Sequence, residues 1–215
     1  KLVVCDAGWS AGDAANAGAA SASGRWLLFL DQHVVLRRGA VERMVAAGGG
    51  APEPWIVGGR LSDPMGRERA RARTAPLTTW SAFALALNLN GARARRIGDE
   101  AAPVSAVSND FMLLARTDFE DLGGFDGRFA THGADLDLCR RAAAEGGVVL
   151  FEHSAHGVQF GHGRGQDRKA QGLALFAAKS ARSPAERVAA AIAAPALSTM
   201  LWLIDFVAGR PPLRR

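Results

Sequence analysis

Short apolar runs alternate along the chain with stretches of helical spacing. Trp26–Leu30 (WLLFL) is an unbroken apolar block, and a run of that length is more typical of a strand buried on both faces than of a helix. The segments 55–61 (WIVGGRL) and 148–155 (VVLFEHSA) have the same character. Because such strands need helices over both faces of their sheet, the runs predict an α/β domain.

The segments between these runs predict helices. An Ala-rich stretch covers about 13–23, and 39–47 (GAVERMVAA) has apolar residues at helical spacing. The segment 133–147 (GADLDLCRRAAAEGG) is amphipathic and ends in Gly-Gly, a common helix stop. The segment 104–116 (VSAVSNDFMLLAR) has the pattern of a strand, a bend and a second strand. Regular alternation of strands and helices predicts a mostly parallel sheet.

The end of the chain has a different pattern. Residues 188–204 (VAAAIAAPALSTMLWLI) carry no charge, contain Pro195 and are followed by Asp205. They predict an apolar C-terminal helix, which either packs on the domain, lies on a membrane or partner, or spans a bilayer. The stretch is short and Ala-rich for a span. We therefore divide the chain into a domain at 1–165 and a C-terminal helical extension at 166–215.

Composition agrees with a folded domain and adds a basic charge. The 215 residues are 48% hydrophobic and 22% charged, with a net charge of +5. Arginines cluster at 67–73 (RERARAR), 93–96 and 214–215. They either line solvated loops or contact phosphates on anionic lipid or on a phosphorylated substrate. No helix-turn-helix, zinc-finger or RNP signature is present, so nucleic acid is not an expected partner.

Carboxylates stand where an α/β sheet binds ligands. Asp31 directly follows the apolar block 26–30, and open α/β sheets bind ligands beyond the carboxyl ends of their strands. Asp135 and Asp137 open the predicted helix 133–147, and a helix N-terminus favours ionised carboxylates. Asp135 is therefore placed to accept a proton from an incoming hydroxyl.

Six motifs follow one another in order. They are NAG (16–18), FLDQH (29–33), SNDFMLLAR (108–116), GGFDGRF (123–129), ADLDLCRR (134–141) and FEHSA (151–155). Their order and spacing resemble the pattern of inverting family 2 glycosyltransferases with a GT-A fold, over about residues 1–165. The resemblance implies a Rossmann-like, mostly parallel sheet flanked by helices. The family's first strand, its nucleobase-binding loop and its second strand have no counterpart ahead of Asn16.

The resemblance also implies roles for the matched residues. Asp135 matches the base that takes the proton of the acceptor hydroxyl, and Asp31 matches the first acid of the D-x-D element, near the donor ribose and the metal. The other matched residues are those facing the acceptor or the donor sugar, Asp110, Asn109 and Asp137, and those supporting the site, Asn16 and Arg140.

Two positions depart from the family pattern. His33 stands where the second acid of D-x-D usually binds the metal, and Ala134 replaces a common Glu. The implied cofactor is a divalent ion, Mn²⁺ or Mg²⁺, and an imidazole suits Mn²⁺ better because Mg²⁺ prefers oxygen. Gln159 matches the position of a metal-binding His in the family, and His162 is the nearest histidine beyond it. His162 either joins Asp31 and His33 or lies in a solvated loop.

The expected function follows from the resemblance. It is transfer of a sugar from a nucleotide-sugar donor to a hydroxyl of a glycan or lipid-linked acceptor, by inverting single displacement. The expected location is cytoplasmic, peripheral on the inner face of the membrane. One alternative is a catalytically degenerate domain that binds a partner or a membrane, as His33 and Ala134 would allow. Another is a nucleotidyltransferase, although the chain lacks that class's Gly-rich N-terminal loop bearing Lys or Arg.

Overall fold

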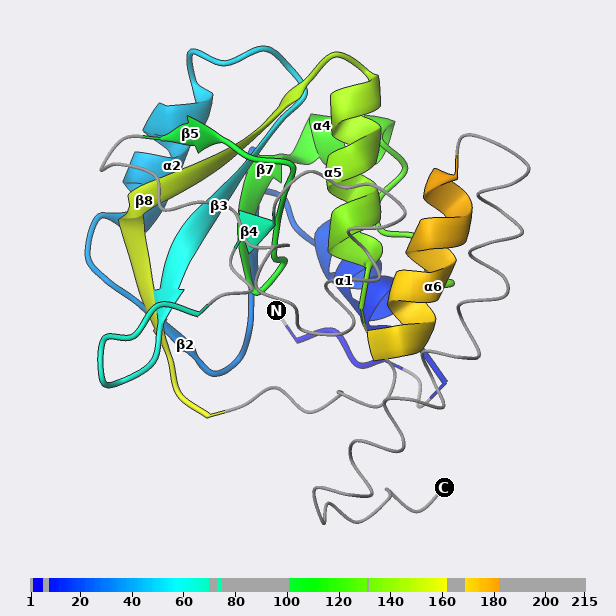
Figure 1. The fold of residues 1–215 in the computed structure, drawn as a ribbon, viewed down its shortest axis with the longest axis horizontal. Helices are drawn as coiled ribbons and strands as arrows, with labels where there is room; N and C mark the ends of the chain where they lie inside the picture. The colour runs from blue at the N-terminus through cyan, green and yellow to red at the C-terminus, as the bar shows by residue number, and fades with distance from the viewer. Residues whose placement is uncertain are drawn as a thin grey trace.

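The fold is built on one mixed sheet between two layers of helices (Figure 1). The computed structural model describes residues 2–5, 8–69, 73–74, 101–130, 132–161 and 169–181. The predicted apolar helix at 188–204 and most of the arginine clusters lie outside these residues. Within them, no helix is both long and apolar enough to cross a membrane. The predicted α/β class is confirmed.

The sheet has the strand order β1-β7-β3-β8-β2, and a further short strand, β5, pairs with β8. Strands β3 and β8 pair in parallel, whereas β7 runs antiparallel to both of its neighbours, β1 and β3. The bounds are β1 Trp26–Leu30, β2 Val34–Leu36, β3 Trp55–Ser62, β5 Ala102–Pro103, β7 Phe111–Ala115 and β8 Val148–Gln159. A second small sheet pairs β4 (Arg73–Thr74) with β6 (Ala106–Val107).

The prediction of a mostly parallel sheet is wrong in strand direction. Strand β7 enters between β1 and β3 in reverse, and β2 returns antiparallel beside β8. Strand β7 has four of its five residues buried, whereas β1, predicted to be buried on both faces, lies at one end of the described strand order and has Leu27 alone buried. Burial does not report direction, however, because a central antiparallel strand covered by helices has the same composition as a parallel one.

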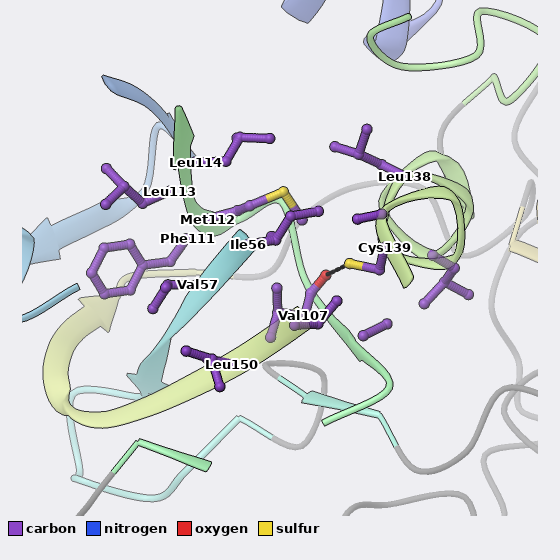
Figure 2. Packing of buried hydrophobic residues seen from close by; sticks show 14 of the residues in the cluster. Ile56, Val57, Val107, Phe111, Met112, Leu113, Leu114, Leu138, Cys139 and Leu150 are labelled. Atoms are coloured by element: carbon purple, nitrogen blue, oxygen red, sulfur yellow. Dashed lines mark hydrogen bonds between the residues drawn. The ribbon is translucent and has the colours of Figure 1, made fainter. Parts of the chain in front are cut away.

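Helices cover both faces of the sheet. The helices described are α1 Ala11–Ala20, α2 Ala40–Gly48, α4 Arg116–Asp121, α5 Ala134–Ala144 and α6 Lys169–Ser180. Helix α2 packs against Trp55 of β3, where a Cβ on Gly48 would overlap the indole ring. The neighbouring residue Ile56 points to the opposite face and packs toward Leu138 of α5 (Figure 2). The two helices thus enclose β3 from either side, as alternation along a strand requires.

The core between the sheet and α5 is fully enclosed. Ile56, Met112, Leu138 and Cys139 each have no exposed surface. The Cys139 thiol donates a hydrogen bond of 3.9 Å to the carbonyl of Val107, which joins α5 to β6 (Figure 2). Burial raises the pKa of Cys139 to about 12, so this thiol is an inert core group. The result is a rigid base for the N-terminus of α5.

Helix α1 begins two residues earlier than expected, at Ala11. Ser10 and Asp13 form a capping box: the Ser10 hydroxyl accepts from the Asp13 amide at 3.0 Å, and the Asp13 carboxylate accepts from the Ser10 amide at 3.0 Å. Asp13 thus occupies the third helical position, near the start of the helix, where its carboxylate completes the capping box.

Candidate active site

The Asp31–His33 turn lies directly beyond the carboxyl end of β1, as predicted. The Asp31 carboxylate accepts a hydrogen bond from the His33 amide at 2.8 Å, and its Oδ1 is 3.1 Å from Nδ1 of the His33 ring. The side chains of His33 and Asp31 remain 42% and 21% exposed, respectively. A carboxylate and an imidazole are thus held together at the edge of the sheet, within reach of a ligand from solvent.

The bend at 108–110 adjoins this turn. Its last residue, Asp110, accepts a hydrogen bond of 3.0 Å from the Asp31 amide through its backbone carbonyl, which extends the pairing of β1 with β7. The Asp110 amide in turn donates to the Ser108 hydroxyl at 3.2 Å. Asn109 and Asp110 are half-buried here. Of the predicted sugar-facing residues, Asp110 is therefore joined to Asp31 through the backbone, and Asn109 precedes it in the bend.

Asp135 lies at the same end of the sheet. A tight turn joins the C-terminus of α5 to the start of β8, so α5 runs antiparallel to the first part of that strand (Figure 1). Asp135 is half-buried in the first turn, and its carboxylate accepts a hydrogen bond of 2.9 Å from the Leu136 amide. The bond between Cys139 and Val107 fixes this helix against β6, which leads into the bend at 108–110.

The structure contradicts the predicted sugar contact of Asp137. Its side chain is 0% exposed and lies 2.8 Å from both Arg141 Nε and Lys179 Nζ. Burial alone would raise the pKa of Asp137, but the hydrogen bonds and charges of Lys179 and Arg141 lower it below its ordinary value. Positions two apart on a helix lie about 200° apart around its axis. Asp137 must therefore face inward if Asp135 faces the site.

Arg140 and Asn16, the predicted supporting residues, make different contacts. Arg140 Nη2 is 3.4 Å from Asp137 Oδ1, a long contact on the side of α5. Asn16 uses its whole side-chain amide: Nδ2 donates to the Phe125 carbonyl at 2.8 Å, and Oδ1 accepts from the Phe125 amide at 2.9 Å. Asn16 thus ties α1 to the GGFDGRF turn.

The end of β8 runs beside the Asp31–His33 turn. Val34 pairs with Gln159, and the Phe160 amide donates to the His33 carbonyl at 2.8 Å. His162, a predicted metal ligand, follows shortly after and lies outside the described residues. Within the part of the chain that the structure describes, no group of three or more His, Cys, Asp or Glu side chains is arranged to hold a metal.

His156 of β8 lies beside a bulge in that strand. The pairing register of β3 with β8 jumps from Gly59–Glu152 to Arg60–His156, so β8 bulges there. His156 Nε2 is 2.8 Å from the Ser62 hydroxyl oxygen at the edge of this bulge. Because the bulge is several residues back along the strand from Gln159, His156 is separate from the Asp31–His33 turn.

Sequence reasoning missed Lys179. The carboxylate of Asp126, in the GGFDGRF motif, binds Arg128 at 2.6 Å. Lys179 Nζ lies 2.8 Å from the same carboxylate. The hydrogen bonds from Arg128 and then Lys179 hold the pKa of Asp126 well below its ordinary value. A single cation at the end of the otherwise apolar stretch LALFAAK was the available signal. The partner 53 positions away could not be deduced from it.

The fold of the chain is similar to that of GT-A glycosyltransferases. A crystal structure of GalNAc-T7 with UDP, GalNAc and Mn²⁺ matches with a TM-score of 0.60 at 16% identity, over 77% of this chain and 32% of that chain. At such low identity the likeness shows the fold alone.

Among curated proteins, the chain is similar to N-acetylglucosaminyl-diphospho-decaprenol L-rhamnosyltransferase from two strains of Mycobacterium tuberculosis. The identity is 24% over 151 residues, covering 66% of this chain. The chain spans about half the length of these relatives, 49%. No family model matches the chain. Membership of family 2 therefore stays a prediction.

Proposed function

We propose that the chain carries the core of a glycosyltransferase that moves a sugar from a nucleotide-sugar donor to a hydroxyl acceptor. One observation carries this proposal: at one end of a GT-A sheet, the Asp31–His33 turn adjoins the Asp110 bend, and the helix bearing Asp135 begins at the same end. By this proposal, Asp31 is the donor-side carboxylate and Asp135 the base, and both act beyond the carboxyl ends of the strands, where open α/β sheets bind ligands.

The proposed reaction is an inverting single displacement. The Asp135 carboxylate accepts the proton of the acceptor hydroxyl while that oxygen forms a bond to the anomeric carbon. The bond from the anomeric carbon to the donor diphosphate oxygen breaks in the same step, and the nucleoside diphosphate leaves with the electron pair. Attack from the opposite face inverts the configuration. The base is half-buried, so it can meet a hydroxyl that enters from solvent.

Asp31 and His33 are the residues we propose as two ligands of a divalent ion. Their oxygen and nitrogen atoms converge to 3.1 Å and remain accessible. This donor set suits Mn²⁺ better than Mg²⁺, and the GalNAc-T7 structure was determined with Mn²⁺. When bound, such an ion would neutralise charge on the leaving diphosphate. Asp31 and His33 would orient the diphosphate against the end of β1, and His162 stays a candidate third ligand.

The proposed acceptor is a lipid-linked glycan. The curated relatives are named for a diphospho-decaprenol acceptor, and the net charge of +5 favours contact with anionic surfaces. By this proposal the protein works in the cytoplasm, peripherally on the inner face of the membrane, with no nucleic-acid partner.

The Asp135→Asn variant tests the proposal. We expect it to lower transfer by at least about 100-fold, the usual scale for loss of a general base, while nucleotide binding by calorimetry stays unchanged. The matched control is Asp121→Asn, an exposed acid on α4. Transfer is measured with labelled UDP-, GDP- and dTDP-sugars on a polyprenyl-diphospho-sugar, and NMR reports the anomer formed. Full activity in Asp135→Asn would refute the assignment of the base.

A second candidate function is a glycosyltransferase-like module without catalysis. His33 in place of an acid favours it, together with the buried Ala134 where the family carries Glu. It predicts nucleotide or membrane binding with no turnover for any donor or metal. Turnover by the wild-type chain above that of Asp135→Asn would exclude this alternative.

A further inference from the structure

Helix α6 lies against the start of α5, the helix that bears the proposed base. A Cβ on Gly172 of α6 would lie 2.0 Å from the His132 carbonyl oxygen. A Cβ on Gly133, the N-cap of α5, would lie 3.0 Å from the Gly172 carbonyl oxygen. The backbones of the two segments therefore touch directly before Asp135.

Two turns further along α6, the ammonium group of Lys179 lies between two carboxylates. Its Nζ is 2.8 Å from Asp126 Oδ2 and 2.8 Å from Asp137 Oδ1, and it is 5.8 Å from the centre of the Phe129 ring. The side chains of Asp126 and Asp137 are only 15% and 0% exposed. Carboxylates with so little solvent need fixed cationic partners.

These two carboxylates belong to different segments of the site. Asp126 is in the GGFDGRF turn, whereas Asp137 is in the first turn of α5. Arg141 makes a second link between these segments, since it binds Asp137 at 2.8 Å and the Gly124 carbonyl at 2.7 Å. The described side-chain partners of the two carboxylates are Arg128, Arg140, Arg141 and Lys179. Of these, Lys179 alone comes from a helix other than α5.

We propose that Lys179 is a positioning residue, which joins Asp126 to Asp137 and so fixes the first turn of α5 in the orientation that presents Asp135 to the acceptor; this inference rests on the proposed function. Asp135 and Asp137 share one helical turn, so a shift of the Asp137 backbone moves the base with it. A displacement of about 1 Å in reacting groups can cost about 100-fold in rate. Lys179 does not touch the reacting atoms and acts through Asp137.

The test compares Lys179→Met with Lys179→Arg and with the control Arg116→Met. Arg116 forms an exposed ion pair with Glu120, and its amide binds the Arg25 carbonyl at the amino end of β1, away from the site. We expect Lys179→Met to lower kcat by about 10- to 100-fold with the KM for the donor within about 2-fold. Lys179→Arg should recover most of the rate, because it keeps the charge. Arg116→Met should match the wild type.

Hydrogen exchange gives a readout that does not need activity. Lys179→Met should raise amide exchange in 123–137 while the β3 and β7 amides stay protected. If the wild-type chain shows no transfer, the proposed function fails, and the exchange result still decides whether Lys179 holds this turn. Wild-type kcat in Lys179→Met, unchanged exchange in 123–137, or an Arg variant as slow as the Met variant would each overturn the inference.

A milder variant covers the case in which Lys179→Met does not fold. Asp126→Asn removes one of the two carboxylates that Lys179 joins and leaves the more buried Asp137 pair intact. We expect a smaller fall in kcat and exchange raised in 123–129. Asp126→Asn with wild-type kcat and wild-type exchange would overturn the inference.

Discussion

The side-chain amide of Asn16 satisfies both backbone hydrogen-bonding groups of Phe125. It donates to the carbonyl at 2.8 Å and accepts from the amide at 2.9 Å, across 109 positions of sequence. Phe125 is 2% exposed and packs edge-on against Phe29 and Phe119, at centroid distances of 4.8 and 5.3 Å. One helix near the start of the chain thereby orients the turn that precedes the candidate base.

Asn16→Ala should destabilise the fold by about 2–3 kcal/mol, because it leaves two buried backbone groups of Phe125 without partners. The measurement is the free energy of unfolding by urea. The control is Ser23→Ala, an exposed position just after α1, for which we expect a change within about 0.5 kcal/mol. Equal stabilities for the two variants would show that water replaces the Asn16 amide at no cost.

Gly172→Ala should loosen α6 from α5. The added Cβ would meet the His132 carbonyl oxygen at 2.0 Å, so a backbone must move. We expect a loss of about 1–3 kcal/mol, as for other overpacked sites. Gly18→Ala is the matched control, since Gly18 also lies in a helix, α1, and a Cβ added there would meet nothing within 4 Å. There, Ala should add up to about 1 kcal/mol through helix propensity. Thermal unfolding of both variants tests whether the close approach of Gly172 to His132 limits the stability of the protein.

The stability of the protein should fall as the pH drops below about 4. Asp137 and Asp126 both have pKa values lowered from 3.8 by their cationic partners. The folded state therefore binds fewer protons than the unfolded state in this range, and the stabilisation present above the unfolded pKa is lost as the pH falls. Urea unfolding between pH 3 and 6 measures the slope. Asp126→Asn removes one titrating group and should flatten it; an identical slope would contradict this origin.

His156 should titrate below its ordinary pKa of 6.5. Burial lowers this pKa, and the charges of Arg60 and Arg37 lower it further. The neutral imidazole is thus favoured in the folded state, so its contribution to stability is present above pH 6.5 and declines as the pH falls below it. NMR titration of the imidazole measures the shift. Arg37→Met should raise the midpoint, whereas Arg38→Met, at the exposed neighbouring residue, should leave it unchanged.

The layers of the fold could be predicted from the sequence, but its strand directions could not. Apolar runs located β1, β3, β7 and β8, and helical spacing located α2 and α5. These patterns report burial, which is a local property of composition. Direction depends on which strands become neighbours, and the placement of β7 between β1 and β3 is set by contacts distant in sequence.

The same distinction between local patterns and contacts distant in sequence applies to the candidate site. Asp31 at the end of β1 and Asp135 in the first turn of α5 could be placed because each position follows from the element beside it. The inward direction of Asp137 is also a consequence of helical geometry, since it lies two positions beyond Asp135. Lys179 could not be assigned, because nothing in α6 indicates which carboxylates it meets.

His33→Asp should change which ion the site prefers. In the structure, the Asp31 carboxylate and the His33 ring offer one oxygen and one nitrogen within 3.1 Å of each other, both open to solvent. Mg²⁺ demands oxygen ligands, whereas Mn²⁺ also accepts imidazole. The wild-type chain should therefore bind nucleotide more tightly with Mn²⁺ than with Mg²⁺, and His33→Asp should narrow this difference in affinity by about 10-fold, or about 1.4 kcal/mol.

Calorimetry with a nucleoside diphosphate and each ion measures these affinities. The His33→Ala variant separates the loss of a metal ligand from the exchange of nitrogen for oxygen. Equal nucleotide affinity of the wild-type chain with the two ions would mean that His33 takes no part in metal binding. Asp31 would then act on the diphosphate without His33.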